Sequence, residues 1–261
     1  MIVFGKGAEV LVSTIVVLPT YNEAANLPSL VGSLLAQPVP GLRLLIVDDA
    51  SPDGTGRLAD DLAARSDGRI AVLHRRGDRG LGLAYKDGFR WALRNGAEAV
   101  VQMDADFSHP PADVPRLLET LGASDVAVGS RYTAGGSVAE DWSAGRRTLS
   151  RSANAYARTI LGLRTRDATA GFKAWRRTAL EAVNLERVLS TGYLFQVEMT
   201  YVCERLGLRI AEVPIRFEER RTGRSKMSLK VKLEATLGIV GVWRRHRGIR
   251  PIAKAPAGVR A

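Results

Sequence analysis

Short apolar, β-branched runs alternate with stretches of helical periodicity along the first hundred residues. The apolar runs predict buried parallel strands at residues 13–18, 42–47, 70–73 and 99–103. The stretches between them predict helices at residues 23–37, 54–65 and 82–95, each introduced by Asn, Asp or Gly turn chemistry. This succession predicts an α/β fold with a Rossmann-like, mainly parallel sheet and helices on both of its faces.

The pattern changes after residue 124. It predicts a strand at 126–130, a loop at 135–145, a helix at 146–161, a strand-like stretch at 209–217 and a final amphipathic helix around 229–243. No internal repeat or long linker interrupts the chain. We therefore expect an N-terminal extension (1–12), one compact domain (13–228), a basic surface helix (229–247) and a tail (248–261) whose Pro, Ala, Gly and Lys content predicts disorder.

The net charge of +11 is confined to the end of the chain. Residues 1–204 contain 23 Lys and Arg against 23 Asp and Glu, whereas residues 205–261 contain 15 against 4. A basic segment attracts polyanions, either nucleic acid or an anionic bilayer surface. A solvated tail that serves only solubility is the alternative.

Cysteine content and hydropathy indicate the redox compartment of the chain and whether it spans a membrane. The single cysteine, Cys203, excludes an intrachain disulfide and favours a reducing, cytoplasmic compartment. No run approaches 18 uninterrupted apolar residues, so we do not expect the chain to span a membrane.

Polar residues follow the predicted strands at the edge where such sheets bind ligands. After the first strand, Tyr21 offers a stacking face and Glu23 an acceptor, although an acidic residue at an ordinary helix start is the simpler interpretation. After the second strand we assign Asp49 to ligand contact and Asp48 to bracing the turn. Asp53 and Thr55 read as capping residues.

Asp104 and Asp106 follow the fourth strand at spacing i, i+2. In extended geometry they point the same way and can hold one hard divalent cation, Mg²⁺ or Mn²⁺, together with phosphate oxygens and water. Two exposed aspartates before a turn are the alternative. His109, beside two prolines, is interpreted as a structural residue or as one that supports the metal ligands from behind.

These strand ends carry a family resemblance. The series Pro-Thr-Tyr-Asn-Glu from Pro19, Asp-Asp-Ala-Ser-Pro-Asp-Gly-Thr from Asp48, Gly-Leu-Gly-Leu-Ala-Tyr-Lys-Asp-Gly from Gly80 and Met-Asp-Ala-Asp from Met103 resembles the inverting family 2 glycosyltransferases of GT-A fold. The later motifs resemble the polyprenol (dolichol) phosphate mannose synthases: Gly-Ser-Arg-Tyr from Gly129, Ala-Gly-Phe-Lys from Ala170, Gly-Tyr-Leu-Phe-Gln-Val-Glu from Gly192 and Arg-Arg-Thr-Gly-Arg-Ser-Lys from Arg220. The resemblance covers about residues 13–235.

The resemblance implies a donor site for GDP-mannose. The residues it assigns to the donor are Pro19, Tyr21, Glu23, Asp49, Asp104, Ala105, Asp106, Arg220 and Lys226. Asp104 and Asp106 would bind the diphosphate through Mg²⁺ or Mn²⁺. Ser108 stands where relatives commonly have Gln, which leaves a third side-chain ligand for the metal open.

The resemblance also implies an acceptor site for a polyprenyl monophosphate. It assigns the lipid phosphate to Arg131, Arg146 and Ser150. Arg146 and Ser150 are i, i+4 on the predicted helix and can converge on one phosphate, while Arg131 approaches from the preceding strand. Asp106, Arg131 and Arg220 would carry catalysis, and Phe195, Gln196 and Glu198 would shape the sugar pocket. A position in the hydrophobic core is the alternative for Phe195.

The implied reaction is a single displacement that inverts the anomeric centre and yields polyprenyl phosphate β-mannose and GDP. The attacking phosphate has a second pKa near ~6 and is largely dianionic at neutral pH, so no general base is needed. A UDP-sugar donor such as UDP-glucose on the same lipid class is the nearest alternative. A binding module without catalysis is another.

The final predicted helix has an interfacial design. Leu229, Leu233, Leu237 and Val240 share one face, with lysines beside them and the basic residues 244–247 beyond. We expect peripheral association with an anionic membrane surface on its cytoplasmic side, and docking to a separate membrane-anchoring subunit stays open. A nucleic-acid-binding protein is a further alternative, but aromatic residues do not interleave the basic ones, so no nucleic-acid partner is expected.

Overall fold

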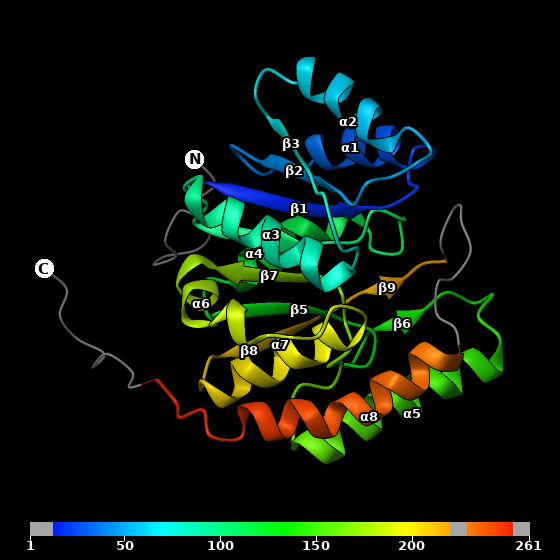
Figure 1. Ribbon diagram of the computed structural model, residues 1–261, viewed down its shortest axis with the longest axis vertical. Coiled ribbons are helices and arrows are strands. Elements are labelled where there is room, and N and C mark those ends of the chain that lie inside the picture. Colours follow the sequence, from blue (N-terminus) through cyan, green and yellow to red (C-terminus); the bar gives the residue numbers. More distant parts are fainter. Residues whose placement is uncertain (1–12, 220–228, 253–261) are drawn as a thin grey trace, which may run out of the picture.

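A seven-stranded sheet forms the centre of the molecule (Figure 1). The structure is a computed structural model that describes residues 13–219 and 229–252, with the backbone alone described for 229–237. The strands are β1 Thr14–Thr20, β2 Arg43–Asp48, β3 Ile70–His74, β4 Ala99–Gln102, β5 Val126–Ser130, β7 Lys173–Arg176 and β8 Ile210–Pro214. Their order is β3-β2-β1-β4-β7-β5-β8; β7 is antiparallel to both neighbours and the other pairs are parallel. The predicted mainly parallel α/β sheet is confirmed.

Helices cover both faces of the sheet, as predicted. One face carries α1 Leu27–Leu35, α2 Thr55–Ala64 and α4 Val114–Thr120, and the other carries α3 Leu81–Arg94, α6 Arg177–Ala182 and α7 Leu194–Arg205. Two 3-10 turns lie at Pro111–Asp113 and Leu185–Arg187. Within β1, Val16 packs in the core between the sheet and α1, α2 and α4, whereas Val17 packs in the core between the sheet and α3, α6 and α7. A strand that is buried on both faces needs apolar residues at successive positions, which is the pattern that predicted it.

Two long helices form a further layer outside α7. These are α5 Ala144–Leu161 and α8 Leu229–His246, which lie side by side in Figure 1. Leu161 of α5 and Ile239 and Val242 of α8 pack against Val197 and Tyr201 of α7. Within the described part of the chain, no helix has the length and apolar character required to cross a bilayer.

The second half of the chain differs from its prediction in several places, and the helices α6 and α7 were not predicted. The loop expected at 135–145 contains the short strand β6 Ser137–Val138 and the start of α5, and the strand expected at 209–217 divides into β8 and β9 Arg216–Phe217. The central strand β7 was not predicted. It contains Lys173, whose fully buried ammonium donates to the Gln196 backbone and side-chain oxygens at 3.2 and 3.1 Å.

The segment after α8 contacts the end of α7. The Ile252 N–H donates to the Leu206 carbonyl at 2.9 Å, and Arg205 Nη2 donates to the Ile249 carbonyl at 3.0 Å. The structure describes residues 248–252 of the predicted tail, and the expected disorder of residues 248–261 stays a prediction. Residues 253–261, like the extension 1–12, lie outside the described residues.

Candidate functional site

A cavity of about 670 Å³ opens at the carboxyl ends of β1, β2 and β4. The chain order of the strands reverses between β1 and β4, and doubly wound sheets bind ligands at such a point. The cavity is lined by all the described residues that the sequence assigned to the donor: Pro19, Tyr21, Glu23, Asp49, Asp104, Ala105 and Asp106. The other two, Arg220 and Lys226, lie outside the described residues.

Strained backbone accompanies these strand ends. Asn22, Ala50 and Phe107 have positive φ angles of 60°, 55° and 63°. Residues with a Cβ rarely adopt this region, and such strain concentrates at functional sites. Each of the three directly adjoins a cavity residue in sequence, so the unusual turns occur where the chain presents Tyr21, Asp49 and Asp106.

The adjacent carboxylates after β2 have different partners. Asp49 lines the cavity, where one oxygen accepts from the Gly80 N–H at 2.8 Å and the other binds the Arg75 guanidinium. Asp48 accepts from the Ser51 hydroxyl at 2.6 Å and the Ser51 N–H at 3.2 Å. Asp48 therefore braces the turn, as its position predicted.

Arg79 lines the same cavity and was not singled out from the sequence. Its Nη1 donates to the Tyr21 hydroxyl at 2.9 Å, its guanidinium lies 4.7 Å from the Tyr21 ring centre, and its Nη2 donates to the Ala50 carbonyl at 3.0 Å. The sequence signal that could have identified Arg79 is its position directly before the motif that begins at Gly80. The contact gives the Tyr21 end of the cavity a cation held against an aromatic face.

Asp104 and Asp106 stand on the cavity wall with donors beside them. The Tyr85 hydroxyl donates to Asp104 Oδ1 at 2.7 Å, and the Ser108 N–H donates to Asp106 Oδ1 at 3.0 Å. Burial raises the pKa of Tyr85 well above its usual range, and the negative charges of Asp104 and Asp106 raise it further. Tyr85 therefore stays a protonated donor at neutral pH.

The oxygen atoms on this wall of the cavity suit a hard divalent cation as ligands. Two carboxylates supply oxygen ligands, and no three side chains of His, Cys, Asp and Glu come together within the described ranges. An ion such as Mg²⁺ can accept one or two protein carboxylates and complete its shell with phosphate oxygens and water. The Ser108 hydroxyl is buried, and it has no hydrogen-bond partner among the residues that the structure describes.

His109 is a structural residue, as expected. Burial lowers its pKa although Asp104 and Asp106 act in the opposite direction. The neutral ring stacks on Phe172 with centroids 5.1 Å apart, and Nδ1 accepts a long hydrogen bond of 3.4 Å from the Asp104 N–H. His109 therefore supports the backbone of the acidic loop.

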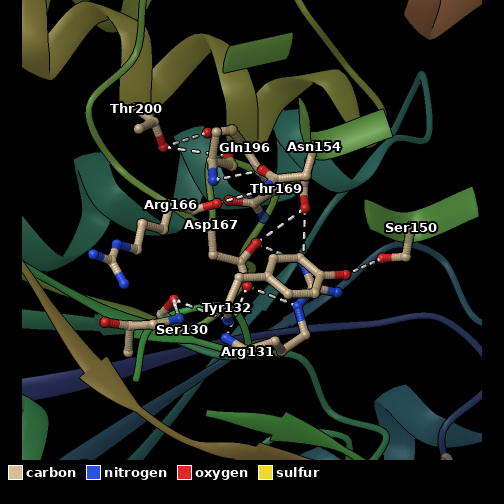
Figure 2. Close-up of polar contacts among 12 residues, drawn as sticks. Ser130, Arg131, Tyr132, Ser150, Asn154, Arg166, Asp167, Thr169, Gln196 and Thr200 are labelled. Atoms are coloured by element: carbon tan, nitrogen blue, oxygen red, sulfur yellow. Dashed lines mark hydrogen bonds and ion pairs between the residues drawn. The ribbon is translucent and has the colours of Figure 1, made fainter. Parts of the chain in front are cut away.

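Of the residues predicted to bind the acceptor phosphate, Arg131 is held by Asp167, as Figure 2 shows. Arg131 Nε and Nη2 each donate to a carboxylate oxygen of Asp167 at 2.7 Å, and Nη2 also donates to the Thr169 hydroxyl at 2.7 Å. Burial would raise the pKa of Asp167, but the charge and hydrogen bonds of Arg131 lower it below its usual range. Asp167 was not identified from the sequence.

The other two predicted acceptor residues, Ser150 and Arg146, each contact an aromatic residue. The Ser150 hydroxyl hydrogen-bonds the Tyr132 hydroxyl at 2.6 Å (Figure 2), and the Arg131 guanidinium lies 5.1 Å from the Tyr132 ring centre. Arg146 stacks on Trp142 at 3.9 Å and pairs with Glu219.

Phe217 connects the Arg131 cluster, defined here as Arg131, Tyr132, Trp142, Arg146 and Ser150, to the loop that contains Asp104 and Asp106. Its ring centre lies 5.3 Å from the Arg131 guanidinium, 5.6 Å from the Trp142 ring and 5.3 Å from the His109 ring. Since His109 contacts the backbone of Asp104, only two rings separate the acidic wall of the cavity from Arg131 along this path.

Phe195, Gln196 and Glu198 are absent from the described residues that line the cavity. Phe195 stacks on Tyr85 in the core, at 5.9 Å between ring centres. Gln196 accepts from Gln102 and Lys173, and Glu198 faces the end of α8. Their expected role as direct walls of a sugar pocket stays untested.

Two close relatives cover almost the whole chain. A polyprenol monophosphomannose synthase of Mycolicibacterium smegmatis is 46% identical over 242 residues, which are 90% of this chain and 91% of that protein. An undecaprenyl-phosphate mannosyltransferase of Micrococcus luteus is 46% identical over 236 residues, which are 90% of this chain and 96% of that protein.

Solved structures share the fold at lower identity. The glucosyl-3-phosphoglycerate synthase of Mycobacterium tuberculosis, solved with Mn²⁺, UDP and glucosyl-3-phosphoglycerate, superposes with a TM-score of 0.62 at 21% identity, covering 92% of this chain and 81% of that one. At this identity the likeness shows the fold alone, which is the GT-A fold that the family resemblance implied. Residues 15–183 match the family described as Glycosyl transferase family 2, and with this match over more than half of its length the chain belongs to that family of glycosyltransferases.

Proposed function

We propose that this chain transfers mannose from GDP-mannose to a polyprenyl monophosphate with inversion at the anomeric carbon. The observation that carries the proposal is the juxtaposition of a strand-end cavity bearing Asp104 and Asp106 with the Arg131 cluster, through His109 and Phe217. The names of the two 46% identical relatives support a polyprenyl phosphate acceptor and a mannosyl group.

Residues after β1 and β2 form the nucleoside end of the proposed donor site. Pro19, Tyr21, Glu23 and Asp49 would hold the nucleoside, with Arg79 adding positive charge over Tyr21. Arg220 and Lys226 would reach the diphosphate, as the family resemblance implies. Pro19, Tyr21, Glu23 and Asp49 would thus recognise the nucleoside, and Arg220, at the diphosphate, would also take part in catalysis.

Asp104 and Asp106 would hold Mg²⁺ or Mn²⁺ at the diphosphate end, and Ala105 lines the cavity between them. When bound, the ion supplies positive charge to the departing diphosphate. Tyr85, by donating to Asp104, fixes the orientation of that carboxylate.

Arg131, Arg146 and Ser150 would bind the acceptor phosphate and aim one of its oxygens at the anomeric carbon. A bond then forms from this oxygen to the anomeric carbon while the bond to the GDP oxygen breaks, so that the pair of electrons leaves with GDP. The phosphate is already dianionic near neutral pH, and no proton has to be removed. Asp167 holds Arg131 in one orientation before the substrate arrives. The entropy lost when Arg131 aligns the acceptor phosphate is therefore smaller.

The proposal places the enzyme on an anionic membrane surface, where its lipid acceptor resides. Exposed apolar side chains on α5 and α8, Leu149, Tyr156, Ile160, Val240 and Trp243, support this position. The basic charge of residues 205–261 supports attraction to acidic lipids. A separate membrane-anchoring subunit is an additional partner compatible with the same face.

Purified protein, polyprenyl phosphate in detergent and radiolabelled GDP-mannose with Mg²⁺ or Mn²⁺ test the function. We expect organic-soluble label that survives mild alkali and is released by mild acid, and NMR of the product should show a β-linked mannosyl phosphate. A parallel reaction with UDP-glucose tests the alternative donor. Transfer from UDP-glucose in preference to GDP-mannose, or full activity in a chelator, would contradict the proposal.

A further inference from the structure

Glu198 on α7 is a fully buried carboxylate that the proposed mechanism does not use. Its Oε2 accepts from the Ser190 N–H at 2.8 Å. Its Oε1 hydrogen-bonds His246 Nε2 at 2.8 Å and also binds the Arg245 guanidinium. One side chain therefore joins the segment before α7 to the C-terminal end of α8.

The three partners of Glu198 belong to two elements that line the donor cavity. All six residues from Leu189 to Leu194, here called the 189–194 segment, line the cavity, and so does Gly238 of α8. The position of this segment relative to α8 consequently determines the shape of one side of the cavity.

The 189–194 segment is also fixed from the opposite side by α3. The Gly82 N–H donates to the Thr191 carbonyl at 2.8 Å. A Cβ on Gly82 would lie 2.6 Å from the Ser190 carbonyl oxygen, so only glycine permits this approach. The segment is thus held between the N-terminal turn of α3 and, through Glu198, the last turn of α8.

The charge of Glu198 depends on donors from both sides. Burial alone would raise the pKa of this carboxyl, but hydrogen bonds from His246 and Ser190 and the charge of Arg245 lower it to about 2. Burial of a charged carboxylate costs free energy unless its hydrogen-bond and ion-pair partners remain in place. A displacement of α8 would therefore take the donors His246 and Arg245 away from Glu198, so that the carboxylate would no longer be fixed in its position against Ser190.

The end of α8 has a second anchor that does not touch Glu198. Arg205 Nη2, also from α7, donates to the Arg247 carbonyl at 2.8 Å and to the Ile249 carbonyl at 3.0 Å. Attachment of the helix end and alignment of the cavity wall are therefore separable by mutation.

We infer that Glu198 and His246, with Arg245, are positioning residues that transmit the placement of the C-terminal helix to the 189–194 segment and so set the affinity for the nucleotide of the donor. The inference rests on the proposed function, because it takes this cavity as the nucleotide-sugar site. It makes α8 a structural part of the donor site as well as a surface helix.

The first test measures hydrogen exchange in the ligand-free full chain, so that it does not depend on the donor's identity. We expect the amide of Ser190 to exchange at least about 10-fold faster in Glu198→Gln and His246→Ala. His246→Gln, whose amide can donate to the same oxygen, should restore slow exchange. Arg205→Ala is the control and should leave exchange at Ser190 unchanged. Unchanged exchange in both Glu198→Gln and His246→Ala, or equal acceleration in Arg205→Ala, would overturn the inference.

The second test uses GDP with Mg²⁺ by calorimetry, followed by steady-state kinetics with GDP-mannose. In His246→Ala we expect the Kd for GDP and the KM for GDP-mannose to rise about 10-fold while kcat changes little. His246→Gln and Arg205→Ala should behave as the unmodified protein. If the unmodified protein fails to bind GDP, the proposed donor is wrong while the exchange experiment still decides the positioning role. If it binds GDP and His246→Ala binds equally tightly, the inference fails and the proposed function stands.

Discussion

Arg131 and Asp167 form a bidentate ion pair in which Nε and Nη2 of the arginine each donate to a different carboxylate oxygen at 2.7 Å. The Arg131 backbone N–H also donates to Asp167, at 3.0 Å. Such parallel hydrogen bonds fix the plane of a guanidinium as well as its distance. The proposed acceptor arginine is therefore oriented by the fold and does not rely on the substrate for its orientation.

Replacement of Asp167 should affect both stability and acceptor binding. Asp167→Asn leaves Arg131 buried with a neutral partner, so we expect the free energy of unfolding to fall by about 3 kcal/mol and the KM for polyprenyl phosphate to rise about 10-fold. Urea unfolding and acceptor titrations measure the two effects. Asp60→Asn, which removes a half-exposed partner of His74, is the control and should change neither. Unchanged acceptor KM in Asp167→Asn would show that Arg131 does not depend on this pair.

The grouping of the strand-end residues around one cavity was predictable because it depends on local signals. Strand ends are recognisable from apolar runs, and Pro19, Tyr21, Asp49 and Asp104 follow those runs directly. Parallel strands bring their carboxyl ends to one edge, so residues far apart in the chain meet there without any knowledge of side-chain contacts. The boundaries of β5 and most of α5 were also predictable, because they too depend on the local pattern of apolar and polar residues.

The unpredicted parts depend on pairing between distant residues. Asp167 lies 36 residues after Arg131 in an irregular stretch that has no periodic pattern. The strand β7 escaped detection because its first residue is Lys173, whose buried charge is compensated by oxygens of Gln196, 23 residues away. Polar side chains inside a core read as surface residues until their partners are known.

Tyr85→Phe tests the support of the proposed metal site. Removal of the hydroxyl takes away the donor to Asp104 Oδ1 while the ring keeps its stacking on Phe195. Partners of metal-binding carboxylates affect metal affinity 10- to 100-fold, so the Mn²⁺ concentration for half-maximal activity should rise about 10-fold. Tyr201→Phe on α7 is the matched control and should leave the metal titration unchanged. Superimposable titrations of Tyr85→Phe and the unmodified protein would exclude this role.

Asp106→Asn tests the acidic wall itself. Loss of one charge beside the leaving diphosphate should lower kcat/KM by about 10²-fold or more, in line with the loss of one preorganised electrostatic contact. Asp113→Asn, in the turn that follows, removes the pair with Arg116 outside the cavity and should have little effect on the same ratio. A fall of less than about threefold in Asp106→Asn would remove Asp106 from the proposed machinery.

Glu198 predicts a specific acid dependence of stability. Its pKa is about 2 in the folded protein against an ordinary value of 4.5, because the donors His246, Ser190 and Arg245 outweigh burial. A lowered folded pKa contributes stability that is complete above about pH 4.5 and is lost as the pH falls towards 2, with a total of roughly 3 kcal/mol. Urea unfolding between pH 5 and 2.5 should show a shallower loss of stability in Glu198→Gln than in the unmodified protein. Glu181→Gln, an exposed partner of Arg177, should keep the original slope.

Membrane association should depend on the outer faces of α5 and α8, which lie side by side in Figure 1. Trp243 is 38% exposed and lies beneath the Arg247 guanidinium, 5.1 Å from the ring centre. An aromatic ring with a basic neighbour suits the interface of an acidic bilayer. Arg247→Gln should therefore weaken binding to phosphatidylglycerol vesicles about 5-fold, the equivalent of about 1 kcal/mol per basic residue, and Trp243→Glu should weaken it further. Arg57→Gln, on α2 at the opposite end of the molecule, removes the same charge and should leave co-sedimentation unchanged. Equal loss in Arg57→Gln and Arg247→Gln would show that net charge, and not this face, governs the association.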